Sequence, residues 1–496
     1  MRVLAICAVC FLFAAGSVFS AGVDLTGIGA RAQALGSYRG VSDDWSGMFW
    51  NPAGIVFSDG FSAGFSLEFI TPIVSYTAKP LNSQFVGGTS NQEIENERKT
   101  FPAPSGGLIY SNGKYAFGLG VWAPFGLGGE WDLLSTSGYN KEYPRNDFED
   151  NLQVIDIHPT FAIKLSENFS VGAGVSLIMA DIMIRKPNFT PNPYVFNPML
   201  AQVAGALTAT SAAMGAPSPV APPFTHLLTE STLDGSGTGF GANLGLMFKP
   251  TPTLSIGASV QYYQTIGLEG TVDAVTYFAN HPVANGVINS DQVKPQFDAM
   301  LAGGMITPDE YAVLVGFYSG ATPPRDLGLK VKADMPLPIK AGIGVAYSGI
   351  SNLLITADAA MTQWSSWDVI KIKKANGNEF SELVENWENS IRLGLGLEYN
   401  LTNIILRGGF YTENQAVVEE TMTPSIPDVG RRSVFLAGVE VPVGPLRLHA
   451  SYERMNISDM DVTEWVPTAD GTGYDNMAGL YSMYANLFMF GVDYAF

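Results

Sequence analysis

Few residues of the sequence are of the kind that performs catalysis. The four histidines are His158, His226, His281 and His449. On a β-strand His449 and Ser451 would share one face, as a serine nucleophile and its base require, but no third residue is placed to orient the histidine. The scattered histidines and the loop acids Asp459 and Asp461 do not form a metal site. We therefore expect neither an enzyme nor a metal or cofactor.

Basic residues offer a second kind of chemistry, the binding of a carboxylate. Five of them would face the inside of a barrel, namely Lys164, Lys340, Arg392, Arg407 and Arg447. Acids that would face the same way are their alternative partners: Glu68, Asp156, Asp358, Glu398, Glu440 and Glu453. Both interpretations stay open, because a ligand with a carboxylate needs a cation whereas an uncharged ligand needs none. We select Lys340, Arg392 and Arg407 as candidate ligand contacts.

The first residues have the pattern of a secretory leader. Arg2 precedes an apolar stretch and then a run of small residues. We expect cleavage after Ser20, so that residues 1–20 form a signal peptide. Cys7 and Cys10, the only cysteines, lie within it. The remaining chain would therefore have no disulfide and no thiolate chemistry.

The composition favours a membrane-embedded β-structure. Charged residues make up only 15% of the chain and aromatic residues 11%, and there are 54 glycines. Soluble proteins average about 25% charged residues. No apolar run after the leader reaches the roughly 18 residues of a transmembrane helix, so a secreted chain of this kind suggests a transmembrane β-barrel. The net charge of −19 disfavours nucleic acid as a partner.

Period-2 alternation of apolar residues predicts the strands. In the final stretch, NLFMFGVDYAF, bulky apolar residues take every second place from Phe488 to Phe496. The pattern recurs over 155–164, 391–399 and 446–453, with polar or charged residues between. In a barrel the apolar face meets lipid and the other face meets the lumen. A terminal Phe on such a strand is typical of bacterial outer-membrane barrels.

Short and long connections alternate along the chain. Short turns are expected at 111–113, 166–168, 250–253, 348–351, 400–403 and 442–445. Long connections are expected at about 80–103, 124–150, 184–236, 273–335, 368–388, 413–430 and 456–478. Six turns and seven loops join fourteen strands, and the even number places both termini on the periplasmic side with the short turns. The predicted fold class is all-β, a 14-stranded antiparallel transmembrane barrel.

Two of the long connections carry helical signals. Leu200 and Leu207 recur at helical spacing, and the TPDE stretch from Thr307 to Glu310 is a capping box. Such helices could frame an external groove for a ligand, lined by Leu200, Val203, Leu207, Phe297, Leu301, Leu314 and Phe317. The alternative is that the two loops only pack together as a lid.

A broken apolar segment precedes the first expected strand, which begins near Gly60. This segment, DDWSGMFWNPAGI, covers residues 43–55. Its Met-Phe-Trp run is strongly hydrophobic, while Pro52 and Gly54 can continue neither a helix nor a central strand.

Five stretches together resemble one family. They are the segment 43–55, APFGLGGEW at 123–131, IHPTFAIKLSENFSVGAGVSLI at 157–178, PSIPDVGRR at 424–432 and the closing FGVDYAF. In order and spacing they resemble the FadL/TodX-type outer-membrane transporters of long-chain fatty acids or aromatic hydrocarbons. The loops 184–236 and 273–335 look expanded and match poorly, which leaves the substrate open.

The resemblance implies a barrel over residues 60–496 whose N-terminal segment, 21–59, folds back as a plug, or hatch, inside the lumen. It implies that ligand passes from an external groove to a lumenal pocket and, after plug movement, leaves sideways into the bilayer. Besides the three cations, the candidate ligand contacts are Phe49, Trp50, Asn51, Pro52, Ala53 and Trp122. A plug that is merely packed, with no ligand contact, is the alternative.

The resemblance also implies a lateral opening in the third strand, which we expect over about 114–123. The candidate residues at its outer end are Pro124, Phe125 and Gly126. Pro124 cannot donate to a strand ladder, and Gly126 has no side chain to pack. The alternative is an ordinary strand end that enters a glycine-rich loop.

The expected function is therefore passive, plug-gated uptake of hydrophobic compounds across a bacterial outer membrane. The alternatives are a water-filled porin and a surface adhesin or receptor that binds a partner through its expanded loops. The expected partners are hydrophobic small molecules, outer-membrane lipid and the barrel-assembly machinery, and we expect a monomer.

Overall fold

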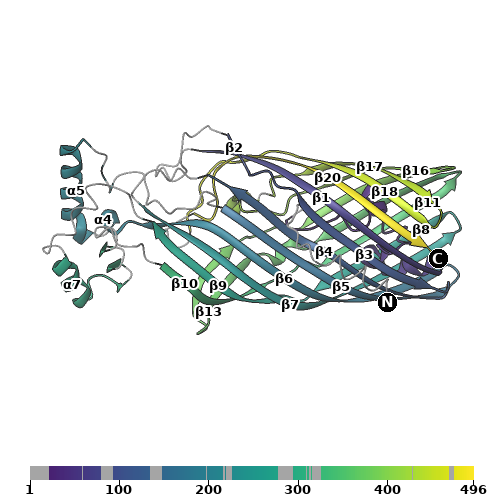
Figure 1. Ribbon diagram of the computed structural model, residues 1–496, viewed down its shortest axis with the longest axis horizontal. Coiled ribbons are helices and arrows are strands. Elements are labelled where there is room, and N and C mark those ends of the chain that lie inside the picture. The colour runs from purple at the N-terminus through teal and green to yellow at the C-terminus, as the bar shows by residue number, and fades with distance from the viewer. Residues whose placement is uncertain are drawn as a thin grey trace.

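A closed antiparallel sheet forms most of the computed structural model (Figure 1). The structure describes residues 22–58, 60–79, 93–133, 148–196, 198–215, 218, 220, 226–277, 294–308, 310, 311, 314, 315, 325–426, 428–468 and 474–495. The predicted signal peptide and Phe317 lie outside these residues. No helix in the described part of the chain is long and apolar enough to cross a membrane.

The barrel closes between its first and last strands. The first half of the sheet contains β1 (Gly60–Ala78), β2 (Glu93–Glu95), β3 (Phe101–Ser111), β4 (Tyr115–Trp131), β5 (Phe148–Ser166), β6 (Phe169–Pro191), β7 (His226–Thr251), β8 (Leu254–Tyr263), β9 (Ile266–Tyr277) and β10 (Arg325–Met335). The second half contains β11 (Lys340–Ile350), β12 (Leu353–Thr362), β13 (Val369–Lys374), β14 (Glu379–Val384), β15 (Ser390–Leu401), β16 (Ile404–Glu413), β17 (Arg432–Val443), β18 (Leu446–Ile457), β19 (Met460–Val462) and β20 (Gly479–Ala495). β1 pairs with β20 along its length, from Ser62 opposite Ala495 to Ala78 opposite Gly479.

These segments make fourteen antiparallel strands, as the turn count predicts. β8 and β9 form one interrupted strand, because both pair with β7. β10 and β11 likewise form one strand, facing β9 and β8 in turn. β13 and β14 are a hairpin beyond β12 and β15, while β2 and β19 are short additions beside β1 and β20. The predicted fold class is therefore confirmed.

The six predicted short turns are present and lie at one end of the barrel, here called the turn end. They join β3 to β4, β5 to β6, β7 to β8, β11 to β12, β15 to β16 and β17 to β18. At the opposite end, here called the helix end, stand α4 (Pro193–Phe196), α5 (Ala201–Ala213) and α7 (Lys294–Ala302), beside the 3-10 turn η3 (Pro198–Leu200) (Figure 1). The last strand, β20, finishes at the turn end.

Several strands run further toward the helix end than predicted. β6 and β7 have 23 and 26 residues, and β4 reaches Trp131 rather than ending near residue 123. Crossing a bilayer takes only about 9–11 residues, and beyond that length lipid no longer imposes an apolar outer face. The alternation of apolar and polar residues is therefore lost before the strand itself ends. As a correction, Gly126 lies within β4 and not in a loop.

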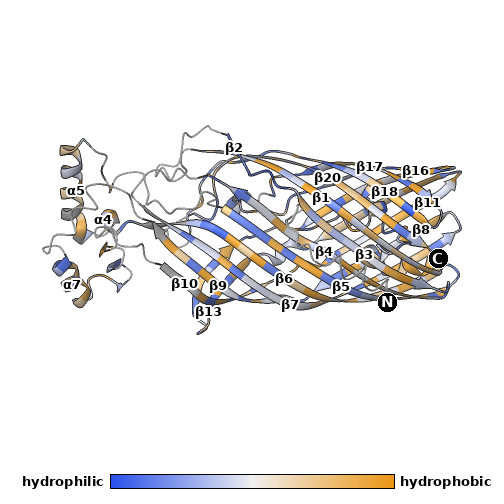
Figure 2. Cartoon of the chain, in the orientation of Figure 1, coloured by the Kyte–Doolittle hydropathy of each residue, from blue (hydrophilic) through white to orange (hydrophobic). Residues whose placement is uncertain are grey.

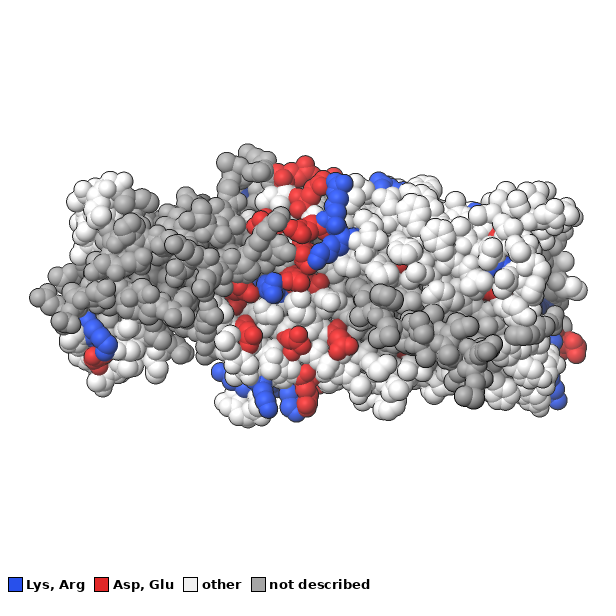
Figure 3. All heavy atoms as spheres, viewed as in Figure 1, with Lys and Arg blue, Asp and Glu red and all other residues white. Residues whose placement is uncertain are grey.

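The two faces of the strands differ as the alternation predicts. On β15, Ile391, Leu393, Leu395 and Leu397 are more than half exposed on the outer surface, and the residues between them point inward. Figure 2 shows the same alternation of hydrophobic and hydrophilic residues on strands around the barrel. On the face shown in Figure 3, charged residues gather toward the helix end, and a wide zone nearer the turn end is almost uncharged. This outer zone suits contact with lipid.

The residues ahead of β1 lie inside the barrel. Residues 22–58, here called the inner segment, contain α2 (Ala30–Leu35), α3 (Gly47–Trp50) and the 3-10 helix η2 (Pro52–Phe57). α2 packs against β15 to β18, and η2 packs against strands from β3 to β8. Gly257 allows a close approach, since a Cβ there would collide with the carbonyl oxygen of Arg39. The inner segment thus occupies the lumen and contacts most of the wall.

Candidate functional site

A small cavity lies between the tip of the inner segment and the barrel wall. Its lining contains Asp24, Leu25, Thr26, Arg39, Phe49, Trp50, Gln261, Lys340, Ala360, Met361, Thr362, Arg392 and Glu413. Four of the predicted ligand contacts, Phe49, Trp50, Lys340 and Arg392, are therefore brought together here. The cavity has a volume of about 30 Å³, far below the roughly 150 Å³ of a cavity that holds one benzene molecule. A hydrophobic ligand cannot enter it in this arrangement.

Two of the cations at the cavity are tied to carboxylates. Lys340 forms an ion pair with Asp24, and its Nζ lies 4.2 Å from the centre of the Phe125 ring. Arg39 lies 3.4 Å from the Asp358 carboxylate. Burial lowers the pKa of the Arg39 guanidinium, and Asp358 opposes this shift. Arg39 and Lys340 are therefore partly neutralised by the protein itself.

Arg392 differs from both, because no carboxylate of the described residues forms an ion pair with it. Its guanidinium donates to the carbonyl oxygen of Gly36 at 3.3 Å and lies 3.7 Å from the centre of the Tyr411 ring. Arg407, the third selected cation, does not line the cavity. It binds Glu398 at 2.7 Å and also binds Glu440. Arg392 is thus the cavity cation with capacity for an anion, whereas Arg407 belongs to an ion network of the wall.

The Asn-Pro-Ala turn is placed away from the cavity. The Asn51 side chain accepts from the backbone of Ala53 at 3.2 Å and donates to the carbonyl oxygens of Arg39 and Leu246 at 3.1 and 3.0 Å. The Ser170 hydroxyl donates to the carbonyl oxygen of Ala53 at 2.8 Å. Asn51, with Pro52 and Ala53, therefore caps η2 and fastens the inner segment to the wall.

The tip of the inner segment, residues 22–26, pairs with the edge of β4 through two backbone hydrogen bonds. The backbone N–H of Leu25 donates to Pro124 at 3.0 Å, and Gly126 donates to Val23 at 2.8 Å. Asp24 and Phe125 face each other between these two hydrogen bonds. The predicted lateral-opening residues thus contact the tip directly.

The wall is incompletely paired where the tip lies. β3 pairs with β4 from Ser111 opposite Ala116 only as far as Gly106 opposite Val121. Beyond that pair β3 bonds to β1, and β4 bonds to β5 with a register shift between Trp122 and Phe125. Prolines contribute to this gap, because Pro124 has no N–H for a ladder. The described residues therefore leave one edge of β4 free of β3.

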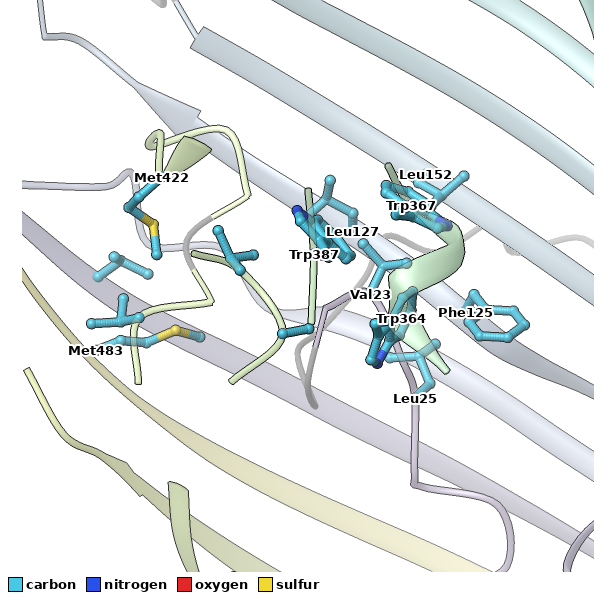
Figure 4. Close-up of a cluster of buried hydrophobic side chains, with 14 of the residues drawn as sticks. Val23, Leu25, Phe125, Leu127, Leu152, Trp364, Trp367, Trp387, Met422 and Met483 are labelled. Atoms are coloured by element: carbon cyan, nitrogen blue, oxygen red, sulfur yellow. The ribbon is translucent and has the colours of Figure 1, made fainter. Parts of the chain in front are cut away.

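Three tryptophans lie beside Val23 and Leu25 of the tip (Figure 4). Trp367 and Trp387 stack with ring centres 4.5 Å apart, and Trp364 meets Trp387 edge-on at 5.3 Å. Phe125 contacts Trp364 at 6.2 Å. These tryptophans come from the connections between β12 and β13 and between β14 and β15. Sequence reasoning missed them. Only Trp387 lies within a predicted connection, 368–388, and Trp364 and Trp367 precede it.

The PSIPDVGRR stretch provides a further anchor for the tip. Asp428 accepts a hydrogen bond from the backbone of Gly22 at 3.0 Å and from that of Ala416 at 2.6 Å. It also pairs with the buried Arg432. The resemblance singled out this stretch, but its contact with the inner segment was not foreseen.

The helices at the helix end pack on one another. Leu200, Leu207, Phe297 and Leu314 of the predicted external groove are at most 1% exposed. Tyr194 contacts Phe297 with ring centres 6.3 Å apart and donates to the carbonyl oxygen of Leu314 at 3.4 Å. The predicted capping box is present. The backbone N–H of Glu310 donates to the Thr307 hydroxyl at 3.1 Å, and the Glu310 carboxylate accepts from the backbone N–H of Thr307 at 2.8 Å. This packing favours the lid interpretation over an open groove.

Three further groove candidates add little to this picture. Leu301 is half-buried. The side chain of Val203 and the whole of Phe317 lie outside the described residues.

The histidine–serine pair on β18 is not arranged for catalysis. His449 Nε2 lies 2.9 Å from the Asp493 carboxylate, while the Ser451 hydroxyl donates to Gln33 at 2.5 Å. The two side chains therefore have separate partners, both within the lumen. No group of three potential metal ligands occurs among the described residues.

Taken together, the closed barrel, its lipid-suited outer zone and its filled lumen define an outer-membrane transport barrel. The chain belongs to the family described as outer membrane protein transport protein (OMPP1/FadL/TodX), whose model matches residues 11–496. The wall therefore crosses the outer membrane, with the turn end on the periplasmic side. No curated protein matches the sequence.

Solved structures share this fold at low sequence identity. A FadL homologue from Pseudomonas aeruginosa matches with a TM-score of 0.70 and 19% identity, over 96% of this chain and 99% of that one. The toluene transporter TodX of P. putida matches with a TM-score of 0.62 and 16% identity, over 95% and 98%. The Ralstonia pickettii toluene transporter TbuX matches with a TM-score of 0.58 and 16% identity, over 95% and 99%.

Proposed function

We propose that the protein takes up hydrophobic small molecules, such as long-chain fatty acids or hydrocarbons, passively across the outer membrane. The structural relatives described as toluene transporters support this class of cargo. Moving an apolar molecule into water costs about 0.8 kcal/mol per CH₂ group. A conduit for it therefore has to offer successive apolar sites and not a water-filled pore. The tryptophan cluster is our candidate for the apolar site between the helix end and the cavity.

The tip of the inner segment acts as the gate. The cavity of about 30 Å³ is too small for any cargo of this class, so something must move before ligand can bind. The tip is held by two backbone–backbone hydrogen bonds to β4, by the hydrogen bond from Gly22 to the Asp428 carboxylate and by the ion pair between Asp24 and Lys340. The rest of the segment is bound more densely, for example by Gln261 and Ser259, which donate to the carbonyl oxygens of Phe49 and Trp50 at 2.6 and 2.7 Å. We therefore assign the movement to residues 22–26.

Displacement of the tip opens two spaces at once. It enlarges the cavity, which Asp24 and Leu25 line, and it uncovers the edge of β4 that β3 leaves unpaired. Cargo then leaves sideways through this gap into the bilayer. The observation that carries the proposal is that Val23 and Leu25 hydrogen-bond to β4 at the gap itself.

Arg392 receives the head group when the cargo is a carboxylate. It is the cavity cation without an ion-pair partner among the described residues, and a charge-assisted hydrogen bond is roughly twice as strong as a neutral one. A hydrocarbon would pass the same cavity without using it. At the cavity, the predicted ligand contacts are thereby narrowed to Phe49, Trp50, Lys340 and Arg392.

Uptake into liposomes tests the proposal. Purified protein is reconstituted, and the entry of radiolabelled oleate or toluene into the membrane and interior is followed against protein-free liposomes. We expect faster, saturable entry of at least one of the two compounds and no steady ion conductance in planar bilayers. Entry no faster than in the protein-free control would reject transport, and a large open conductance would instead support a porin.

A further inference from the structure

Three buried residues on the inner faces of the neighbouring strands β3, β4 and β5, here called the row, each carry a polar atom without a described partner. Ser105 Oγ, Trp122 Nε1 and Asp156 Oδ1 have no hydrogen-bond partner within the described part of the chain. Trp122 and Asp156 are cross-strand neighbours. Ser105 is one residue beyond the last β3–β4 pair, Gly106 and Val121, and is itself paired with Ser66 of β1. It therefore lies where β3 turns away from β4, next to the position of Trp122. The three residues are 4%, 1% and 0% exposed.

Such a row needs a physical explanation, because buried polar atoms in native proteins nearly always have partners. The row combines complementary functions. The Trp122 indole is a donor only, the Asp156 carboxylate oxygen is an acceptor, and the Ser105 hydroxyl is both. A single hydroxyl group placed among them could accept one hydrogen bond and donate another. The row also begins where β3 and β4 separate, at the proposed lateral opening.

Neighbouring contacts hold these polar atoms in place. The Trp122 ring packs edge-on against Phe49 at 5.7 Å and lies 5.2 Å from the His158 ring. The other oxygen of Asp156 accepts from the Ser176 hydroxyl at 3.0 Å. Rotation of either side chain toward another partner would break these contacts. The unpartnered atoms are thus preorganised and not merely misplaced.

The same hydrogen-bonded chain reaches the inner segment. Ser176 Oγ lies 2.9 Å from His158 Nδ1, and His158 Nε2 lies 3.1 Å from Asn243 Oδ1. Asn243 in turn donates to the carbonyl oxygen of Met48 at 2.7 Å. Asp156 is therefore the end of a network that starts at the inner segment, and its Oδ1 is the atom of that network left without a described partner.

We propose that Ser105, Trp122 and Asp156 form a hydrogen-bonding station for a hydroxyl group carried by the cargo. The substrate class would then include hydrophobic compounds with one uncharged hydroxyl, such as long-chain alcohols or alkylphenols, and not hydrocarbons alone. This inference rests on the proposed lateral release, because the station lies on that route. A hydrocarbon at the same place would leave all three atoms without partners.

A matched pair of cargoes tests the station. Entry of radiolabelled 1-dodecanol and of tridecane, which is similar in size, is measured in liposomes containing wild-type protein, Trp122→Phe or Ser105→Ala. Trp465→Phe is the control, because Trp465 Nε1 is also buried without a described partner but belongs to the connection before β20. Circular dichroism of the sheet verifies that each variant folds.

We expect Trp122→Phe and Ser105→Ala each to slow dodecanol entry about 3- to 10-fold, the range of one lost hydrogen bond. Tridecane entry should change less than about 2-fold in both, and Trp465→Phe should change neither. Equal effects on the two cargoes, or no effect on dodecanol, would overturn the station and leave transport intact. Wild-type protein that admits neither cargo would instead reject the proposed function, and the station with it.

Discussion

The backbone N–H of Leu25 donates to the carbonyl oxygen of Pro124 at 3.0 Å, so a residue from the start of the inner segment completes the edge of a wall strand. Pro124 lies where β4 has separated from β3. The free edge of a strand normally attracts another strand. Here the protein's own tip covers it, which links the gate of the lumen to the gap in the wall.

Arg392 should distinguish a carboxylate cargo from a hydrocarbon. Replacing it with Gln keeps a polar side chain but removes the charge, so oleate binding should weaken about 10-fold or more. Toluene binding should stay within about 2-fold. Arg447→Gln is the matched control, because Arg447 is an exposed wall residue paired with Glu440 at 3.4 Å. Equal loss for both ligands would contradict a head-group role, and equilibrium binding to the detergent-solubilised protein provides the measurement.

Glu385 should make the tryptophan cluster sensitive to pH. Burial raises its pKa to about 7, against opposing effects of Lys186 and of its 2.9 Å hydrogen bond from Trp387. A raised carboxyl pKa means that the closed arrangement is fully stabilised below about pH 4.5 and loses this stabilisation as the pH rises through about 7. The difference is on the order of 3 kcal/mol.

Tryptophan fluorescence between pH 4.5 and 8 measures this effect. The emission should shift to the red as the pH rises, because the cluster loosens and Trp387 becomes more solvated. Glu385→Gln should remove the transition and keep the low-pH spectrum. A transition of the same midpoint in that variant would assign the titration to another group.

Asn51 should matter for the position of the inner segment and not for ligand contact. Asn51→Ala removes the cap of η2 and the donors to Arg39 and Leu246, which costs about 1–3 kcal/mol. We expect faster hydrogen exchange over η2 and little change in exchange along β6. Ser58→Ala is a milder control, since it removes one local hydrogen bond to Ile55. Unchanged exchange in Asn51→Ala would contradict an anchoring role.

Much of the wall could be predicted from the sequence. Lipid imposes a strict alternation, as on β15 with its outward Leu393 and Leu395, and short turns carry local glycine and asparagine signals. The extent of β4 could not be predicted, because beyond the bilayer no solvent enforces a pattern on its outer face. The partners of Arg407 could not be predicted either, because Glu398 and Glu440 were only two of six candidate acids. Such pairings depend on strand register and inner-segment packing, which local patterns do not encode.

The residues around the cavity could likewise be predicted only in part. Phe49 and Trp50 were found because an apolar run ahead of the barrel needs somewhere to bury. Asn51 was grouped with them because it is next to them in the sequence, yet its side chain binds the backbone of the inner segment and of β7. The tryptophans 364, 367 and 387 were missed because their loops fold into the lumen, a long-range event without local periodicity.

A disulfide between the tip and β4 tests the central claim most directly. Asp24 and Phe125 are bridge partners that do not bond to each other; such antiparallel pairs have Cα atoms about 4.5 Å apart, within the range of a disulfide. The Asp24→Cys/Phe125→Cys variant would have no other cysteine after the predicted leader. Its reduced form controls for the loss of both side chains. Ala30→Cys/Gly491→Cys is a second control that fastens α2, because a Cβ at position 491 would lie 3.0 Å from that of Ala30.

Entry of oleate and toluene into liposomes is measured with each variant oxidised and reduced. We predict that oxidation of the 24–125 pair abolishes entry, that reduction restores it, and that the 30–491 disulfide leaves it within about 2-fold. Full entry with the tip covalently fastened to β4 would contradict the account, because cargo would then cross without the movement on which both the gate and the lateral opening depend.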